Sequence, residues 1–416
     1  MTTSEKKLII VGGLPLWVSG LIPLVALALM LAIFAFGNPL AMFRVDLPPI
    51  EDLTFERVTV TPSGFDVQLI NGGPDPVTVA QVMVDDAFWQ FQVTPSATIP
   101  RLGRAQLSIP YPWVEAEPNL IRVVTSTGVT FEGAVAIATP TPRPGLREFV
   151  AYGLLGFYVG IIPVALGLLW YPVMKKMGRK WLGAVLALTL GLLVFLLIDT
   201  LLEAFEVASQ LPGAFQGIPL VLFAALLTWL ALVAIGSGRR KQAGTGSSAR
   251  RGIYVAAMIA FSIGLHNLGE GLAIGAAFAL GEAALGSFLV IGFTLHNITE
   301  GIGIAAPLVP GKQTDEQPTP AAQREGPTLL TFVGLALVAG SPAILGAWIG
   351  GFAFSPLLAS LFLGMGVGAI WQVIVEVTSL LKLYASREAA PLYSWANFGG
   401  FLAGLVIMYS TALLVN

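Results

Sequence analysis

The chain has no cysteine, only two histidines and few charged residues among its 416 positions. Without cysteine it cannot contain a disulfide framework, a thiolate metal site or a catalytic thiol. Charged residues make up 11% of the chain and hydrophobic residues 55%, whereas roughly a quarter of the residues in soluble domains are charged. This composition excludes an ordinary soluble domain and indicates a membrane protein.

Long apolar runs account for most of the sequence. A membrane span needs about 20 predominantly apolar residues, and it must satisfy its own backbone hydrogen bonds, which favours helices. We therefore predict an all-α polytopic membrane protein. The first run is longer than the apolar core of a signal peptide, about 7–15 residues, so residues 1–44 are interpreted as a retained anchor helix. The nine candidate spans are 9–36, 149–172, 181–207, 217–236, 252–280, 285–308, 328–352, 355–382 and 391–415.

Basic residues predict the orientation of the spans, because short cytoplasmic loops are enriched in lysine and arginine. With the N-terminus inside and the C-terminus outside, most of the 22 basic residues fall on the cytoplasmic side. The others follow the first span, in a long segment of the kind that is exempt from this rule. The residues placed inside are Lys6, Lys7, Lys175, Lys176, Arg179, Lys180, Arg239, Arg240, Lys241, Arg250, Arg251, Lys312, Arg324, Lys382 and Arg387.

Residues 45–139 differ from the rest of the chain in their alternation of apolar and polar side chains. The period of two at 57–61 and 65–69 is typical of half-buried strands, and turns rich in glycine and proline separate several such runs. Six or seven short strands predict an extracytoplasmic, immunoglobulin-like β-sandwich. It contains no motif that carries chemistry, so a spacer or interaction domain is favoured over a ligand-binding one.

A proline-rich connector joins this domain to the remaining spans. Residues 140–147 include Pro140, Pro142 and Pro144, a pattern typical of stiff, extended linkers. Residues 148–416 are then predicted to form an eight-helix membrane unit. Two of its inner loops are polar and rich in small residues and proline, at 237–251 and 309–327.

Both histidines lie in copies of one motif, His-Asn-x-x-Glu-Gly, within apolar spans. Positions i and i+4 share a helix face, about 6 Å apart along the axis. His266 and Glu270 therefore point the same way, and His296 and Glu300 repeat the arrangement on the next span. The two helices run in opposite directions with each histidine near mid-span, so the motifs can face one another.

Ionisable side chains at this depth indicate a function. Burying one at the bilayer centre costs roughly 2.5–3.5 kcal/mol on insertion scales, so two glutamates predict a bound cation. Imidazole and carboxylate ligands suit Zn(II), Fe(II), Mn(II) or Co(II) better than Cu(I). The alternative is a pair of polar clusters that only bond neighbouring helices, but a duplicated motif is improbable by accident. The glycines Gly271 and Gly301 are interpreted as positions of close helix packing.

These motifs resemble the metal-binding segments of the ZIP (zinc- and iron-regulated transporter-like) family, in its bacterial and archaeal branch. The resemblance rests on residues 266–271 and 296–301 and extends to the span count and outward termini of residues 146–416. It implies a three-plus-two-plus-three helix arrangement, a homodimer, alternating access and the plasma membrane of a prokaryote. It also implies a principal metal site formed by His266, Glu270, His296 and Glu300. An adjacent second metal position is implied at Asn267 and Asn297.

The sequence departs from the family pattern at three positions. Gly269 and Thr299 stand where the family usually has proline, a residue that frees a carbonyl group and bends a helix. Ser341 precedes Pro342 at a place where the family often has a glutamate. We therefore predict a single robust metal site rather than a full binuclear one.

Two further groups of polar residues are secondary candidates. Asp199, Glu203 and Glu206 share one helix face near the outer end of their span, and they form either an entrance that attracts cations or an ordinary solvated helix end. Gln372 and Glu376 lie toward the inner end of another span. They form either an exit site or a local pairing with a lysine.

The sequence favours transport of a divalent cation toward the cytoplasm by alternating access. The metal is the transported substrate: Zn(II) is favoured, and Fe(II), Mn(II) and Cd(II) are the alternatives. No enzymatic activity is expected. One alternative is an intramembrane metal-dependent hydrolase, although no His-Glu-x-x-His motif or spare general base accompanies the site. Another is a transport-deficient metal sensor coupled to the outer β-domain. The expected partners are the metal ion, membrane lipid and a second copy of the chain, and no nucleic acid.

Overall fold

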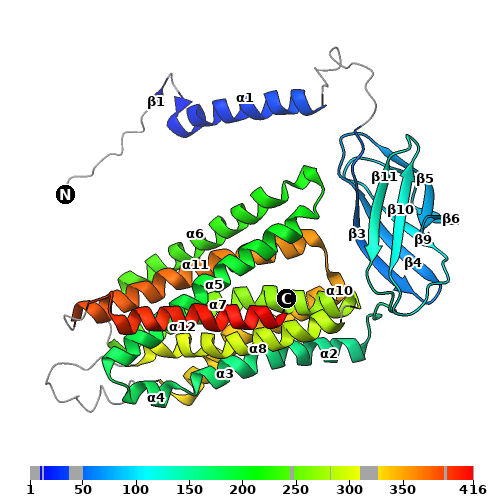
Figure 1. The fold of residues 1–416 in the computed structure, drawn as a ribbon. Helices are drawn as coiled ribbons and strands as arrows, with labels where there is room; N and C mark the ends of the chain where they lie inside the picture. Colours follow the sequence, from blue (N-terminus) through cyan, green and yellow to red (C-terminus); the bar gives the residue numbers. More distant parts are fainter. Residues whose placement is uncertain are drawn as a thin grey trace. The chain divides into compact units, whose positions relative to one another are not determined.

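The computed structural model of the chain describes residues 10–11, 14–36, 50–243, 248–281, 283–309, 327–387 and 391–415. The chain divides into two compact units, Met1–Ile50 and Glu51–Asn416. The first contains one long helix, and the second contains a β-domain and a helical bundle (Figure 1).

The described part of the first unit consists of two short strands and a helix. Strand β1 (Ile10–Val11) pairs with β2 (Leu14–Pro15), and α1 (Leu16–Phe36) follows directly. The helix thus begins later than the predicted span 9–36, directly after a proline, a residue that cannot donate a helical hydrogen bond. Side chains from Leu21 to Ile33 are apolar and exposed, and their role as a membrane anchor stays a prediction.

Two antiparallel sheets form a small β-sandwich at the start of the second unit. One sheet has the strand order β11-β10-β5-β6, with β8 also paired to β5, and the other has the order β3-β4-β9-β7. This confirms the expected small β-sandwich, although the described domain has nine strands rather than six or seven, three of them only two or three residues long. The strands are β3 (Leu53–Thr61), β4 (Gly64–Asn71), β5 (Val77–Val84), β6 (Ala87–Trp89), β7 (Gln92–Thr94), β8 (Thr98–Ile99), β9 (Arg104–Ile109), β10 (Asn119–Thr125) and β11 (Thr130–Val135).

The sandwich has a hydrophobic core of its own. Along β9, Ala105, Leu107 and Ile109 are buried and the residues between them are exposed, as the two-residue period of a strand requires. Ile121 and Val123 of the other sheet are completely buried in the same core. The residues that build this core all come from the sandwich and the segment just after it. Residues 45–49 of the predicted domain lie outside the described residues.

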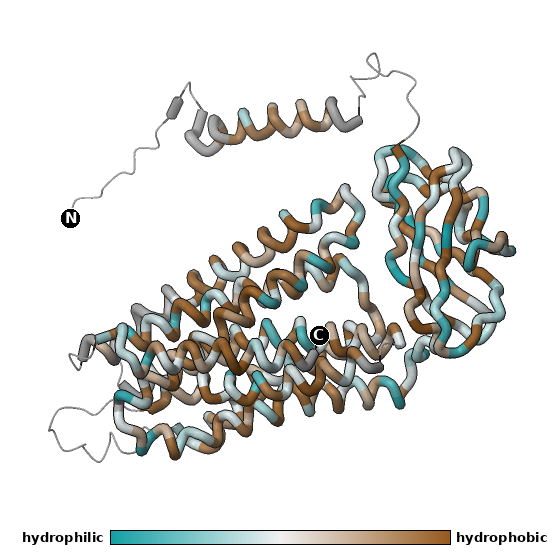
Figure 2. The backbone as a smooth tube through the Cα atoms, viewed as in Figure 1, coloured by the Kyte–Doolittle hydropathy of each residue, from teal (hydrophilic) through white to brown (hydrophobic). Residues whose placement is uncertain are grey.

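Within the described residues, eight helical segments are long and apolar enough to cross a membrane. Hydrophobic residues follow these helices along most of their length (Figure 2). Together they indicate a multi-pass membrane protein, as predicted. The segments are α2–α4, described next, then α5 (Arg179–Ser209), α6 (Gly217–Ala243), α7 (Ser248–Ala279), α8 with η4 (Ala283–Ala305 and Ala306–Leu308), α10 (Leu329–Ala353), α11 (Pro356–Arg387) and α12 (Trp395–Val415).

The first of these spans is irregular, whereas the sequence predicted one uniform helix over 149–172. A π-helix, η2, interrupts the span. A gap of two residues, just before Tyr171 and Pro172, separates its last two helices, α3 and α4. Prolines occupy the first turn of each of the last two segments, where a missing N–H is tolerated. The segments are α2 (Leu146–Gly156), η2 (Phe157–Ile161), α3 (Ile162–Leu168) and α4 (Tyr171–Lys176).

The motif-bearing helices α7 and α8 pack closely against other helices of the bundle. A side-chain carbon at Gly271 of α7 would overlap the carbonyl oxygen of Ala343 in α10. One at Gly301 of α8 would overlap the carbonyl oxygen of Val164 in α3. The final glycine of each motif therefore permits backbone contact, as expected for small residues between membrane helices.

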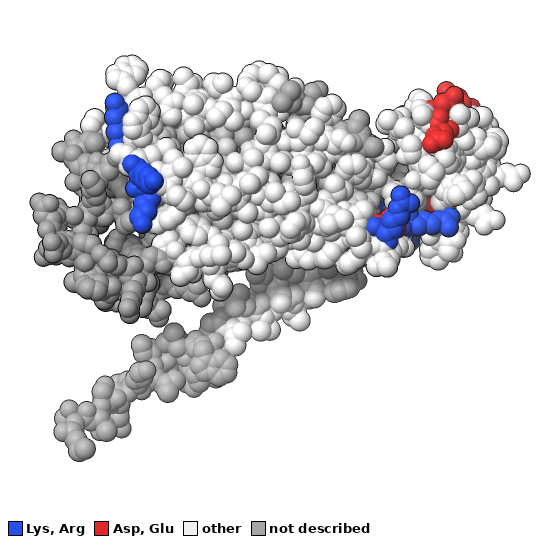
Figure 3. Space-filling view, turned by 90° about the horizontal axis from the view of Figure 1, so that it is seen from below, with Lys and Arg blue, Asp and Glu red and all other residues white. Residues whose placement is uncertain are grey.

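Among the described residues, one outer face of the bundle has a long stretch without charged side chains (Figure 3). Figure 3 shows lysine and arginine at one end of the helices and a long stretch of this face without charge. Lys175, Lys176 and Lys180 are exposed at that end, where α4 gives way to α5. This distribution suits a bundle surrounded by lipid. Several predicted inner residues lie outside the described residues, among them Lys6, Lys7, Lys312 and Arg324.

Candidate metal centre

Helices α7 and α8 bring both histidines and one glutamate together inside the bundle. The side chains of His266, Glu270 and His296 are 5%, 3% and 6% exposed. Nε2 of His266 lies 3.0 Å from Oε1 of Glu270, and Nε2 of His296 contacts the same oxygen. One ligand atom from each residue lies within 4.8 Å of the other two. This is a buried cluster of three groups that could hold a metal ion.

The geometry follows from the motif and from the packing of the two helices. His266 and Glu270 lie one turn apart on the same face of α7. Helix α8 packs against α7, and the ring centroid of His296 lies 6.4 Å from that of His266. The two histidines therefore face each other at similar depth, which is the arrangement expected from the sequence.

The ligand types of the cluster suit a divalent metal ion. Zinc bonds to nitrogen are about 2.0–2.1 Å long and to oxygen about 2.0–2.2 Å, so two ligands of one tetrahedral ion stand about 3.3–3.6 Å apart. The three ligand atoms already lie within 4.8 Å. Because both Nε2 atoms contact Oε1 of Glu270 directly, ion binding requires these contacts to open, and Glu270 supplies the negative charge that a buried cation requires.

Asn297 holds the second carboxylate oxygen of Glu270. Its Nδ2 donates to Oε2 of Glu270 and to the carbonyl oxygen of Val159, at 3.1 Å in each case. Val159 lies in η2, and π-helical turns in proteins often occur at functional sites. Both oxygens of Glu270 are thus hydrogen-bonded, one to the histidines and one to this fully buried amide.

Asn267, the matching amide of α7, contacts a different helix. Its Nδ2 donates to the carbonyl oxygen of Ala339 in α10 at 3.0 Å, three residues before Pro342. The Oδ1 atoms of Asn267 and Asn297 are buried without a hydrogen-bond partner. Because such atoms are normally paired, both oxygens are candidate cation ligands, and a second position at the two asparagines stays a prediction.

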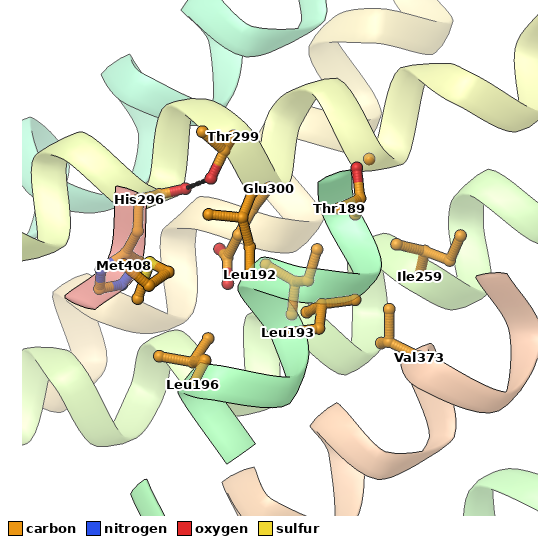
Figure 4. A pocket seen from close by; sticks show the side chains of 12 residues that line it. Thr189, Leu192, Leu193, Leu196, Ile259, His296, Thr299, Glu300, Val373 and Met408 are labelled. Carbon is orange, nitrogen blue, oxygen red and sulfur yellow. Dashed lines mark hydrogen bonds between the residues drawn. The ribbon is translucent and has the colours of Figure 1, made fainter. Parts of the chain in front are cut away.

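Glu300 lies one turn beyond His296, outside the three-residue cluster. Both of its carboxylate oxygens are buried without a hydrogen-bond partner. The side chain faces a cavity of about 10 Å³, close to the smallest space that holds one water molecule. The predicted four-residue site is thus a three-residue cluster with a neighbouring buried carboxylate. The other side chains around the cavity are mostly apolar (Figure 4): Thr189, Leu192, Leu193, Leu196, Ile259, Ile263, Thr299, Val373 and Met408.

The motif helices are regular at Gly269 and Thr299, the two positions that depart from proline in the family pattern that the motifs resemble. The hydroxyl of Thr299 donates to the carbonyl oxygen of His296 at 2.6 Å, drawn as a dashed line in Figure 4. Helix α8 continues through this position, and α7 continues through Gly269. An irregular segment near the cluster is instead η2, whereas α10 continues through Pro342, and Ser341 beside that proline is half-buried.

The three predicted entrance acids lie on α5, beside the cluster rather than in it. Asp199 is exposed, and its carboxylate lies near enough to both histidines to attract them when they are protonated. Glu203 is half-buried and interacts with Glu270, and Glu206 is exposed near the end of the helix. Such a row of carboxylates raises the local concentration of cations. Its role as an entrance stays a prediction.

The predicted exit residues lie on α11 and bond to one another. The side-chain amides of asparagine and glutamine are hydrogen-bond donors to carboxylates. Here Nε2 of Gln372 donates to Oε1 of Glu376 at 3.1 Å. Gln372 is buried, and its Oε1 has no hydrogen-bond partner. The next residue, Val373, lines the cavity at Glu300. The role of the pair as an exit stays a prediction.

Sequence reasoning missed two features around the cluster. One is the carbonyl group of Val159, because a π-helix has no clear sequence signature; Gly160 and Pro163 are the local signals of irregular backbone. The other is the contribution of Thr189 and Met408 to the cavity at Glu300. Contacts between segments so distant in the sequence require the fold.

No model of a known protein family matches the chain, and no curated protein sequence matches it significantly. The fold and the cluster define a class of protein: a multi-pass membrane protein with a buried His–Glu–His group able to hold a metal ion. This combination is compatible with a membrane metal transporter.

Proposed function

We propose that this protein transports a divalent metal ion across a membrane, and that His266, Glu270 and His296 bind the ion during its passage. The observation that carries the proposal is the burial of these three groups between two membrane helices. Ionisable side chains at this depth are costly and normally serve an ion or proton pathway. A transported ion must also leave, so a site with three protein ligands and an exchangeable position suits passage.

The proposed substrate is Zn(II), with Fe(II), Mn(II) and Cd(II) as competitors. Two imidazoles and one carboxylate form a ligand set that zinc accepts. Glu300 is the next carboxylate along α8, and its unpaired oxygens favour contact with an ion that moves past His296. One ion is bound at a time, because Ser341 supplies no carboxylate to a second position.

The proposed path passes the acids of α5, the His–Glu–His cluster and then the pair on α11. The electrostatic interaction of Asp199 with both histidines supports an approach along α5. The position of Val373 beside the Glu300 cavity supports departure past Gln372 and Glu376. Transport is directed inward, with the exposed lysines of α4 and α5 on the cytoplasmic side.

The duplicated motif further supports a ZIP-like organisation. In this proposal the eight helices form a three-plus-two-plus-three arrangement in a homodimer, within a prokaryotic plasma membrane. Alternating access then arises when the motif helices α7 and α8 slide against the others. The π-helix η2 and the proline inside α10, Pro342, are each near an asparagine contact and offer places where such movement can be absorbed.

A flux assay in proteoliposomes tests the proposal. Purified wild-type protein should carry Zn(II) into vesicles that enclose a zinc-sensitive dye, whereas Glu270→Gln should reduce the initial rate at least 100-fold, because the amide cannot supply a charged ligand. His266→Ala and His296→Ala should reduce it at least tenfold. Ser262→Ala is the matched control, since Ser262 is buried one turn before His266 on the same helix, and it should transport normally.

Two results would contradict the proposal. Unchanged flux in Glu270→Gln would remove the cluster from the pathway. Peptide or lipid hydrolysis that requires the same residues, without metal flux in the wild type, would favour the hydrolase alternative. A competition series with Fe(II), Mn(II), Cd(II) and Ni(II), repeated on Ser341→Glu, ranks the metals and tests whether an added carboxylate completes a second position.

A further inference from the structure

An apolar groove of about 390 Å³ runs along the outside of the bundle between α3, α4 and α10. Its volume falls within the range of about 300–1,000 Å³ that is usual for ligand sites. Its lining has almost no polar surface. The residues that line it are Ile161, Ala165, Leu168, Leu169, Tyr171, Pro172, Leu329, Phe332, Val333, Ala336 and Leu337.

The groove forms because η2 and α10 are in contact at two glycines, whereas α3 and the start of α10 lie further apart. At Gly160 of η2 and Gly340 of α10 the backbones are in contact, and a side-chain carbon on either glycine would overlap the other helix. Toward the start of α10 the facing residues carry side chains, so the helices separate. The rings of Tyr171 and Phe332, with centroids 5.1 Å apart, bridge the two walls near the end of the groove.

A basic segment borders the groove at that end. On α4, Lys175 is four residues after Tyr171 and three after Pro172, so its side chain shares the face that lines the groove. Lys176 is four residues after Pro172, and both lysines are exposed. From Trp170 to Lys180 the sequence has four basic residues and no acidic one. This charge is therefore not balanced within the segment.

We propose that this groove binds one anionic phospholipid, with an acyl chain between α3 and α10 and the phosphate at Lys175 and Lys176. The apolar lining matches hydrocarbon, and a tyrosine at the end of the groove is the side chain that membrane interfaces favour. Basic residues beside a membrane helix attract anionic headgroups. Neither the transport proposal nor the metal cluster is required for this site.

Native mass spectrometry of the purified full chain tests the proposal, with phosphatidylglycerol and phosphatidylcholine of identical acyl chains as probes. One lysine near an anionic headgroup contributes roughly fivefold in affinity, so two should give a preference for phosphatidylglycerol of about 25-fold. K175Q/K176Q should abolish this preference. Val333→Trp, which fills the groove from an exposed position, should reduce retention of both lipids at least tenfold.

Matched controls separate the groove from the general lipid-facing surface. Lys382→Gln removes an exposed charge from α11, and Leu402→Trp enlarges an exposed side chain of α12; both should retain lipid like the wild type. The proposal is overturned by equal retention of the two lipids in the wild type, by a preference that persists in K175Q/K176Q, or by undiminished retention in Val333→Trp. Loss of a dimer in Val333→Trp, with lipid retention unchanged, would identify the occupant as a second copy of the chain.

Discussion

At the scale of single residues, the cluster depends on how one carboxylate is held. Glu270 accepts both histidines on Oε1 and Asn297 on Oε2, so its position is set by three side chains from two helices. Asn267 occupies the equivalent place on α7 but bonds only to the backbone of α10 among the contacts described. The two asparagines therefore have different relations to the metal ligands, although their motifs are alike.

This difference predicts unequal effects of removing each asparagine. Asn297→Ala releases Glu270 and should weaken zinc binding by about 10–100-fold, the usual effect of losing a group that orients a metal ligand. Asn267→Ala is the matched control and should weaken binding less than threefold. Isothermal titration calorimetry of the purified protein measures both. Equal losses in the two variants would show that Asn297 has no special role.

A second residue-scale prediction concerns Asp85, in the turn between β5 and β6. Burial raises the pKa of its carboxyl group, but hydrogen bonds from the Leu120 N–H, Asn119 and Tyr111 lower it, and the net pKa lies below the ordinary value of 3.8. Its contribution to stability is therefore fully present above pH 3.8 and is lost as the pH falls through the lower, folded value. Because the side chain is exposed, we expect a contribution of about 1 kcal/mol.

Hydrogen exchange of β10 in the full chain measures this contribution. At pH 7, Asp85→Asn should lower the free energy of opening at Asn119–Thr125, and Asp66→Asn, in β4, is the matched control. The difference between Asp85→Asn and the wild type should shrink as the pH is lowered, after correction for intrinsic exchange rates. A difference that is independent of pH would contradict the role of the charged carboxylate.

At the scale of helices, contact between small residues sets the spacing around the cluster. Gly271 follows Glu270 directly and touches the backbone of Ala343, so Gly271→Ala should force α7 and α10 apart. Overpacking of this kind costs about 1–3 kcal/mol, and the unfolding temperature in detergent should fall. Gly334→Ala, on α10, is the matched control.

The control isolates packing from helix propensity. A side-chain carbon at Gly334 would meet nothing within 4 Å, and alanine favours a helix over glycine by about 1 kcal/mol. Gly334→Ala should therefore leave the unfolding temperature unchanged or raise it. An equal fall in both variants would mean that substitution of glycine, rather than contact with α10, destabilises the bundle.

The sequence predicted the helices better than their irregularities. Apolar length identified all eight spans of the bundle, because a membrane leaves little choice of backbone structure. The four-residue spacing in the motifs likewise predicted that His266 would accompany Glu270. It did not predict η2, the contact of Asn297 with Val159, or the separation of Glu300 from the cluster. These features depend on how helices distant in the sequence pack together.

At the scale of the whole molecule, the β-sandwich and the bundle have separate hydrophobic cores. Each core consists of residues from its own part of the chain, so neither requires the other for burial of its apolar side chains. The His–Glu–His cluster likewise consists of residues from the bundle alone, in α7 and α8. The predicted accessory role of the sandwich is consistent with this division.

Deletion of residues 51–139 should therefore leave zinc affinity within threefold of the wild-type value and leave the bundle folded. The connector that begins at Pro140 then follows Ile50 directly, and the order of the spans is unchanged. Calorimetry reports binding, and proteoliposome flux reports transport by the same preparation. Normal binding and flux would make the sandwich an accessory domain, whereas normal binding without flux would show that it takes part in transport. Loss of zinc binding in a folded deletion variant would contradict the independence of the metal centre.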